Sequence, residues 1–172
     1  MRLTMLTVLI ETRNHEAALA LTLASLVGGA IEGVVRKVIV CDQGSTDGTQ
    51  KVAEHAGCDF IVTGGIAAGI AQAKGEWLLL LEPGARLAEG WIDDVALHTA
   101  KFTMPARFSR ARGSRAAFLS RVFLRPRALA EGLLITRRQA LALSRSSAEA
   151  IARGLAAKRL KAEIWAAAWE KG

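Results

Sequence analysis

The chain lacks most of the features that are typical of secreted proteins, of proteins with structural metal sites and of membrane-spanning proteins. Its two cysteines, Cys41 and Cys58, have neither metal-ligand spacing nor the number needed for a disulfide framework. We therefore expect reduced thiols in a cytoplasmic protein. No uninterrupted apolar run reaches about 18 residues, which argues against a membrane-spanning helix. The first residues resemble a strand rather than a secretory signal. With no repeat and no low-complexity linker, the 172 residues predict one domain.

Acidic residues are absent from one long stretch. No Asp or Glu occurs between Asp94 and Glu131, whereas the rest of the chain holds 15 basic and 16 acidic residues. This basic block therefore supplies the whole net charge of +7. Its eight members are Lys101, Arg107, Arg110, Arg112, Arg115, Arg121, Arg125 and Arg127. A block of this kind attracts phosphates, nucleic acid or an acidic membrane surface.

Three uses of the basic block remain open. Its arginines can face a phosphate group, or they can form a solvated basic surface. They can also lie on the inner face of an anionic membrane, with Phe118 and Phe123 as apolar contacts. Nucleic acid is not an expected partner, because the sequence has no zinc ligands, no helix-turn-helix signal and no aromatic sheet motif.

The most informative stretch runs from Val38 to Thr49. The β-branched residues 38–40 predict a short buried strand. Asp42 follows at its carboxyl end, and a turn rich in glycine and small polar residues leads into a helix. In open α/β sheets this is where ligands bind. The structural alternative is an ordinary turn in which Ser45 and Asp47 cap the helix.

The first half of the chain alternates between strand and helix patterns. Strands are expected at residues 6–10, 38–40, 60–62 and 77–81, and helices at 17–26, 48–56 and 66–73. The Gly28-Gly29 pair is expected to end the first helix. This order predicts a parallel sheet with right-handed crossovers and helices on both faces.

The second half shows weaker patterns. A short helix is expected near residues 91–95, a strand at 131–136 and a helix from Arg137. The alanine-rich tail, residues 146–171, has helical spacing of its apolar side chains. The chain is therefore predicted to be an α/β protein with a short helical C-terminal segment.

Three segments together resemble family 2 glycosyltransferases, which have the GT-A fold. Residues 42–49 (Asp-x-Gly-Ser-x-Asp-Gly-Thr) resemble the nucleotide-binding turn of that family. Residues 6–14 resemble its opening strand, and residues 73–81 resemble the strand that leads to its Asp-x-Asp metal motif. The resemblance covers residues 3–91, about half of the chain. It implies a GT-A-like, mostly parallel sheet flanked by helices.

The resemblance also implies that the two halves of one domain have different functions. Residues 1–100 would form the half that binds a nucleoside-diphosphate sugar. Residues 101–172 would form a basic, helix-rich half that faces the acceptor or a membrane.

Four residues are implied to bind the nucleotide: Thr12, Asn14, Asp42 and Ser45. Thr12 and Asp42 would hydrogen-bond the base or ribose. Asn14 has an alternative role as a helix cap. Glu11 stands where the family usually has proline.

The metal motif departs from the family pattern. Glu82-Pro83-Gly84 occupies the usual place of Asp-x-Asp, where carboxylates hold a divalent cation against the donor diphosphate. Mg²⁺ and Mn²⁺ prefer oxygen ligands, which Glu82 offers and Gly84 does not. The resemblance implies a metal at Glu82, and the alternative is a strand end followed by a turn.

A transferase that inverts the anomeric centre needs a base to deprotonate the acceptor hydroxyl. By its position before the strand at 131–136, Glu131 would take this role, with Asp93 and Asp94 as alternatives. The implied function is sugar transfer to an unknown acceptor, lipid-linked or anionic, in cell-envelope biosynthesis. Two rivals remain: a nucleotide-sugar-binding protein without catalysis, and a basic membrane- or nucleic-acid-binding module on the same scaffold.

Overall fold

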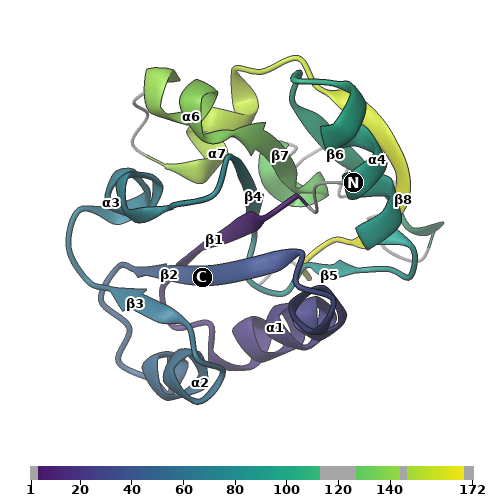
Figure 1. Cartoon of the computed structure of the whole chain (residues 1–172). Helices are drawn as coiled ribbons and strands as arrows, with labels where there is room; N and C mark the ends of the chain where they lie inside the picture. The colour runs from purple at the N-terminus through teal and green to yellow at the C-terminus, as the bar shows by residue number, and fades with distance from the viewer. Residues whose placement is uncertain (1–3, 113–126, 144–146, 169–172) are drawn as a thin grey trace.

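A computed structural model describes residues 4–112, 127–143 and 147–168. In this part of the chain, eight strands form one sheet with the order β3-β2-β1-β4-β7-β6-β8-β5 (Figure 1). The strands are β1 (Leu6–Thr12), β2 (Val35–Asp42), β3 (Asp59–Ile61), β4 (Trp77–Leu81), β5 (Arg86–Leu87), β6 (Ala106–Arg110), β7 (Leu133–Thr136) and β8 (Lys158–Trp165). The helices are α1 (Glu16–Ile31), α2 (Thr49–His55), α3 (Gly65–Gln72), α4 (Trp91–Lys101), the 3₁₀ helix η2 (Ala128–Glu131), α6 (Arg137–Leu143) and α7 (Ala148–Arg153).

The first four strands of this order are parallel, as predicted. β1 lies between β2 and β4 and pairs with both, Ile10 being opposite Val40 on one side and Leu81 on the other. β3 extends the parallel set beyond β2. β1 and β4 are almost wholly buried, which explains why both read as continuous apolar runs.

Two apolar cores cover the two faces of the sheet. Successive side chains of a strand point to opposite faces, so Val8 and Ile10 face the core shared with α1, α2 and α4, while Leu9 faces α3, α6 and α7. Figure 1 shows α1 and α2 on one side of the sheet and α3, α6 and α7 on the other. The prediction of helices on both faces is confirmed.

The first helix does not end at Gly28-Gly29 but continues to Ile31. A Cβ atom added to Gly29 would lie 2.6 Å from the Trp91 ring and 2.8 Å from a Val35 methyl group. Glycine is therefore present because α4 and β2 pack closely against α1, and not because the helix stops there.

The prediction of a helix across residues 146–171 is wrong for β8. Leu160, Ala162 and Ile164 are buried and the residues between them are exposed, which is the alternation of a strand with one buried face. Among the described residues of this region, 147–168, the helix is α7. High alanine content hid the two-residue period, and pairing with β6 and β5 makes the segment a strand.

Strands from both halves of the chain share the sheet. β7 runs antiparallel to β4, and β8 runs antiparallel to β5. The sheet is therefore mixed: β3, β2, β1 and β4 form a parallel set at one side, and on the other side β6 pairs in parallel with β8 and antiparallel with β7. None of the helices in the described ranges is long and apolar enough to span a bilayer.

The packing of Gly29 predicts opposite effects for two neighbouring alanine substitutions. Gly28→Ala meets only an ordinary contact, 3.8 Å from Ile92, and should stabilise the protein by about 0.5–1 kcal/mol because alanine favours helix. Gly29→Ala should destabilise it by about 1–3 kcal/mol through overpacking against Trp91. Urea unfolding of both variants measures the difference. Equal effects of the two substitutions would contradict this account of α1.

Candidate functional site

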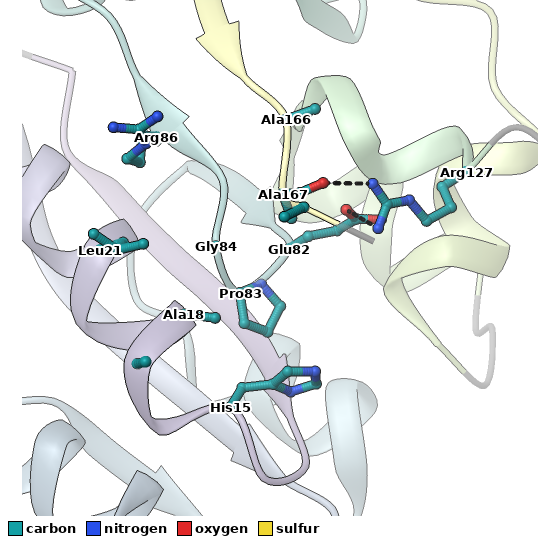
Figure 2. Close-up of a pocket in the computed structure, with 12 residues that line it drawn as sticks. His15, Ala18, Leu21, Glu82, Pro83, Gly84, Arg86, Arg127, Ala166 and Ala167 are labelled. Atoms are coloured by element: carbon teal, nitrogen blue, oxygen red, sulfur yellow. Dashed lines mark hydrogen bonds and ion pairs between the residues drawn. The ribbon is translucent and has the colours of Figure 1, made fainter. Parts of the chain in front are cut away.

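The parallel part of the sheet has a topological switch point between β1 and β4. These strands end side by side, but the chain leaves β1 toward α1 and leaves β4 through the turn at residues 82–84. A cavity of about 510 Å³ opens there (Figure 2). Its walls are the first turns of α1, the turn after β4, Arg127 and residues 166–168 after β8. We call it the switch-point cavity, and such clefts are where open α/β sheets bind ligands.

Asp42 organises the loop at the end of β2. Its Oδ1 accepts hydrogen bonds from Thr12 Oγ1 at 3.0 Å and from Ser45 Oγ, and its Oδ2 accepts from Gly44 N at 3.0 Å and Ser45 N at 2.8 Å. Ser45 Oγ also accepts from Asn14 N at 2.8 Å. The four predicted nucleotide-binding residues therefore form one chain of hydrogen bonds. The Asp42 side chain is buried, and its acceptor positions are used within the protein.

Asn14 joins the two loops and does not cap the first helix. Its backbone has a φ of 56°, in the left-handed region that asparagine tolerates better than most residues. Its Oδ1 accepts from Thr46 N at 2.7 Å. The N-cap of α1 is His15, which makes no side-chain cap hydrogen bond. The interpretation of Asn14 as a cap of α1 is therefore wrong, because its side chain points to the loop after β2.

Asp47 supports the starts of two helices at once. Its Oδ1 accepts from Thr49 N at 3.0 Å, in the first turn of α2, and its Oδ2 accepts from Glu16 N at 3.2 Å, at the start of α1. Glu16 returns a contact, since its Oε2 accepts from Gly48 N at 3.0 Å. The N-cap of α2 is Gly48, which has no side-chain cap hydrogen bond; Asp47, one residue earlier, instead accepts from amides at the starts of both helices and so joins α1 to α2.

Glu11, which replaces the proline of the family pattern, connects β1 to α7. Its Oε1 accepts from Ala148 N at the start of α7, and its Oε2 accepts from the Gln43 side chain at 3.0 Å. Burial raises the pKa of Glu11, while these two hydrogen bonds lower it. The extra carboxylate thus joins the first strand to the C-terminal part of the chain.

Glu82 lies at the end of β4, where the family metal motif would be. Its side chain is 14% exposed and forms an ion pair with Arg127, with 3.5 Å between Oε2 and Nη1 (Figure 2). Burial raises the pKa of Glu82, and the Arg127 charge opposes that shift. Gly84 has no side chain to offer and packs closely against Ala167.

The residues around Glu82 do not fit a divalent cation. Within the ranges that the structure describes, no three His, Cys, Asp or Glu side chains are placed to hold a metal together. One carboxylate already paired with a guanidinium is a poor site for Mg²⁺ or Mn²⁺, which require several oxygen ligands. The metal predicted at Glu82 stays a prediction that this donor set does not favour.

Glu131 emerges near Glu82 at the same end of the sheet. Leu80 of β4 is opposite Leu133 of β7, and each glutamate lies two residues beyond that pair in the same direction. Glu131 pairs with Arg110 at 3.5 Å and with Arg159 at 3.1 Å. The predicted base is therefore held by two guanidinium groups.

The two alternative bases lie on α4. The Oδ2 of Asp94 accepts from Ala162 N at 2.8 Å, which attaches α4 to β8. Asp93 is exposed in the first turn of the same helix. Neither lines the switch-point cavity, and Glu131 does not line it either; Glu131 differs from them in lying at the same end of the sheet as Glu82.

The basic block divides into structural and cavity-facing arginines. Arg107 donates to the carbonyl oxygens of Ala128, Ala152 and Leu155, and so holds η2 and α7 together. Arg127 lines the switch-point cavity. The remaining predicted contacts of this block, Arg115, Phe118, Arg121, Phe123 and Arg125, lie outside the described residues.

Sequence reasoning missed two residues that line the cavity. His15 lines the cavity and directly follows Asn14. Its position in the loop after β1, beside a predicted nucleotide-binding residue, could have identified it as a site residue. Arg86 follows the turn after β4 and stacks over the Trp165 ring at 5.7 Å. Its partner lies in β8, which the sequence patterns did not predict.

Comparison with known proteins shows similarity in structure alone. No family model matches the sequence, and no curated protein matches it. Mannosyl-3-phosphoglycerate synthase from Rubrobacter xylanophilus matches with a TM-score of 0.61 and 12% identity, over 79% of this chain and 55% of that one. Glucosyl-3-phosphoglycerate synthase from Mycobacterium tuberculosis, in complex with Mn²⁺, UDP and glucosyl-3-phosphoglycerate, matches with a TM-score of 0.55 and 18% identity, over 79% of this chain and 58% of that one. The same synthase with Mg²⁺ and UDP matches with a TM-score of 0.56 and 19% identity, over 79% and 57%.

These similarities establish a GT-A-like fold. The chain spans somewhat more than half the length of the synthases it resembles. At such low identity the resemblance concerns the fold, and the assignment to family 2 stays a prediction.

The Asp42 network predicts a pH dependence of stability. Burial alone would raise the pKa of Asp42, but the hydrogen bonds from Ser45, Thr12 and Gly44 outweigh it, and the pKa lies below its usual 3.8. A carboxyl with a lowered pKa stabilises the fold above its unfolded pKa, and the effect is lost as the pH falls through the folded value. Asp42→Asn should therefore cost about 2–4 kcal/mol at pH 7 and much less at the acid end of the range.

Urea unfolding between pH 7 and pH 3 or below tests this expectation. Asp93→Asn, on an exposed helix surface, is the control and should change stability by less than about 0.5 kcal/mol. A cost of Asp42→Asn that is independent of pH would show that the carboxylate charge is not what holds the loop.

Proposed function

We propose that the protein binds a nucleoside-diphosphate sugar at the switch point and transfers the sugar to an acceptor. The observation that carries this proposal is the hydrogen-bond network that joins the two loops beside the switch-point cavity. Thr12 and Asn14 come from the loop after β1, and Asp42 and Ser45 from the loop after β2. The GT-A-like fold supports it, since the similar glucosyl-3-phosphoglycerate synthase was solved with UDP, UDP-glucose and Mn²⁺.

The network assigns different tasks to the four residues. Asp42 fixes the loop, because its oxygens are occupied by Thr12, Gly44 and Ser45. A base or ribose can reach the Asp42 carboxylate only by exchanging with one of these donors. The Ser45 hydroxyl both donates to Asp42 and accepts from Asn14, so its loss would break two hydrogen bonds of the network.

The transfer step breaks one bond and forms one. The bond between the anomeric carbon and the diphosphate oxygen breaks, and its electron pair leaves with the nucleoside diphosphate. The acceptor oxygen bonds to the anomeric carbon and loses its proton to a carboxylate. We assign that carboxylate to Glu131, whose two ion pairs leave acceptor positions unused. The acceptor remains open between lipid-linked and anionic molecules.

A binding protein without catalysis is the second candidate. The specific observation in its favour is that both predicted acidic groups, Glu82 and Glu131, are held in ion pairs with arginine. The membrane-facing role, a peripheral place on the inner membrane and the cytoplasmic location remain predictions. Phe118 and Phe123, the apolar contacts on which the membrane role depends, lie outside the described residues, together with Arg115, Arg121 and Arg125.

Nucleotide binding is the first test of the proposed function. At millimolar concentration, at least one of UDP, GDP, ADP and CDP should raise the melting temperature by several degrees, because a ligand that binds only the folded state stabilises it. Ser45→Ala should weaken that nucleotide about tenfold. Ser25→Ala removes a hydroxyl on α1 that bonds only to the Thr22 carbonyl, and should change affinity less than twofold. No shift with any diphosphate would contradict the proposal.

Catalysis is tested by the release of nucleoside diphosphate from its sugar donor. Glu131→Gln should lower the rate about 10²-fold or more while leaving nucleotide affinity within about twofold, as expected for a general base. Asp93→Asn is the matched control and should retain the wild-type rate. Release by Glu131→Gln at the wild-type rate would remove Glu131 from the mechanism. Nucleotide binding without any release would favour the second candidate.

A further inference from the structure

We propose that the guanidinium of Arg127, rather than a divalent cation, neutralises the phosphates of the ligand in the switch-point cavity. This inference rests on the proposed function and specifies how its anionic ligand is held. It also accounts for the disagreement between the residues around Glu82 and the metal found in similar synthases.

The Arg127 side chain places a permanent positive charge in the lining of the cavity. It stands at the N-terminal end of η2, and its Nη2 donates to the Ala167 carbonyl at 2.9 Å while its Nη1 faces Glu82 (Figure 2). An arginine has five N–H donors in a planar fork. Two contacts fix the orientation of this fork, and donors remain for a ligand. The side chain is 35% exposed, so the cavity reaches it.

The charge around Glu82 disfavours a divalent ion. A cation bound to the Glu82 carboxylate would come close to the positive guanidinium that now pairs with it at 3.5 Å. Like charges at such distances repel strongly where water is scarce. The ion would also gain only one protein carboxylate in exchange for displacing Arg127. Glu82 therefore positions the arginine and does not ligate a metal.

Other groups of the cavity also favour an anion. The described lining holds two guanidinium groups, Arg127 and Arg86, against the single carboxylate of Glu82. Ala17 and Ala18, in the first turn of the 16-residue helix α1, line the same cavity. The positive end of the helix dipole is therefore directed at the space where Arg127 lies. Arginine binds phosphate through paired N–H donors, which suits a diphosphate that carries negative charge as it leaves.

The two roles for Glu82 predict opposite effects of Glu82→Gln. If Glu82 ligated a metal, neutralising it would abolish metal-dependent binding. If Glu82 positions Arg127, the glutamine amide oxygen can take the place of the carboxylate oxygen that now pairs with the guanidinium at 3.5 Å, the hydrogen bond from Arg127 to the Ala167 carbonyl remains, and one negative charge near the phosphates is gone. We expect Glu82→Gln to bind the diphosphate about two- to fivefold more tightly.

Calorimetric titration compares three probes, in EDTA and in Mn²⁺. They are the preferred nucleoside diphosphate from the thermal-shift screen, the corresponding nucleoside and inorganic pyrophosphate. Diphosphate affinity should be the same within about twofold in EDTA and in Mn²⁺. Arg127→Gln should lower it about tenfold or more, Arg127→Lys should lower it less, and nucleoside affinity should change less than about threefold. Arg36→Gln, at the exposed start of β2, is the control and should behave as wild type.

Each outcome decides between the inference and the proposed function. Diphosphate binding that disappears in EDTA, returns with Mn²⁺ and is lost in Glu82→Gln would overturn the inference and leave the proposed function standing. Pyrophosphate binding that requires Arg127, without any nucleotide binding, would support the anion site and contradict the proposed function. Binding of no probe would overturn both. Melting temperatures of the variants without ligand identify any that fail to fold, and Glu82→Gln and Arg127→Lys then still decide the question.

Discussion

The Asp42 carboxylate is the contact on which the arrangement of the switch point depends. It accepts hydrogen bonds from the end of β1, through Thr12, and from the turn after β2, through Gly44 and Ser45. Asn14 extends the network to the backbone of that turn, through Thr46. Two loops that the sequence separates by some thirty residues are thereby joined. A charged acceptor is suited to this task because hydrogen bonds to ionised groups are stronger than neutral ones.

A second set of charges lies at the ends of the adjacent strands β4 and β7. Glu82 and Glu131 emerge at the same end of adjacent strands, and arginines hold both: Arg127 for the first, and Arg110 and Arg159 for the second. Two carboxylates at neighbouring strand ends would repel each other without these cations. The basic block thus supplies intramolecular ion-pair partners as well as surface charge. Pairing of Arg110 and Arg127 with partly buried glutamates explains part of the excess of arginine in this stretch.

The site differs in character from what an Asp-x-Asp motif would produce. In that motif the carboxylates bind a metal cation from solution, and the ligand phosphates also coordinate it. Here the carboxylate at the same position of the fold holds a cation that belongs to the chain. The positive charge at the end of β4 is retained, while the need for several oxygen ligands is removed.

The sequence by itself determined the parallel part of the sheet and the loop of the candidate site. The buried strands β1 and β4 are continuous apolar runs, and the turn from Asp42 to Thr49 carries its own hydrogen-bonding groups, so local chemistry decides both. β8 was not predictable, because alanines at 156–157 and 166–168 flank it and extend the helical pattern, and the segment becomes a strand only by pairing with β5 and β6. The partner of Glu82 was not predictable either. It lies 45 residues away in sequence, in Arg127, and only the tertiary fold brings the two charges together, since ion pairing depends on distance in space and leaves no period in the sequence.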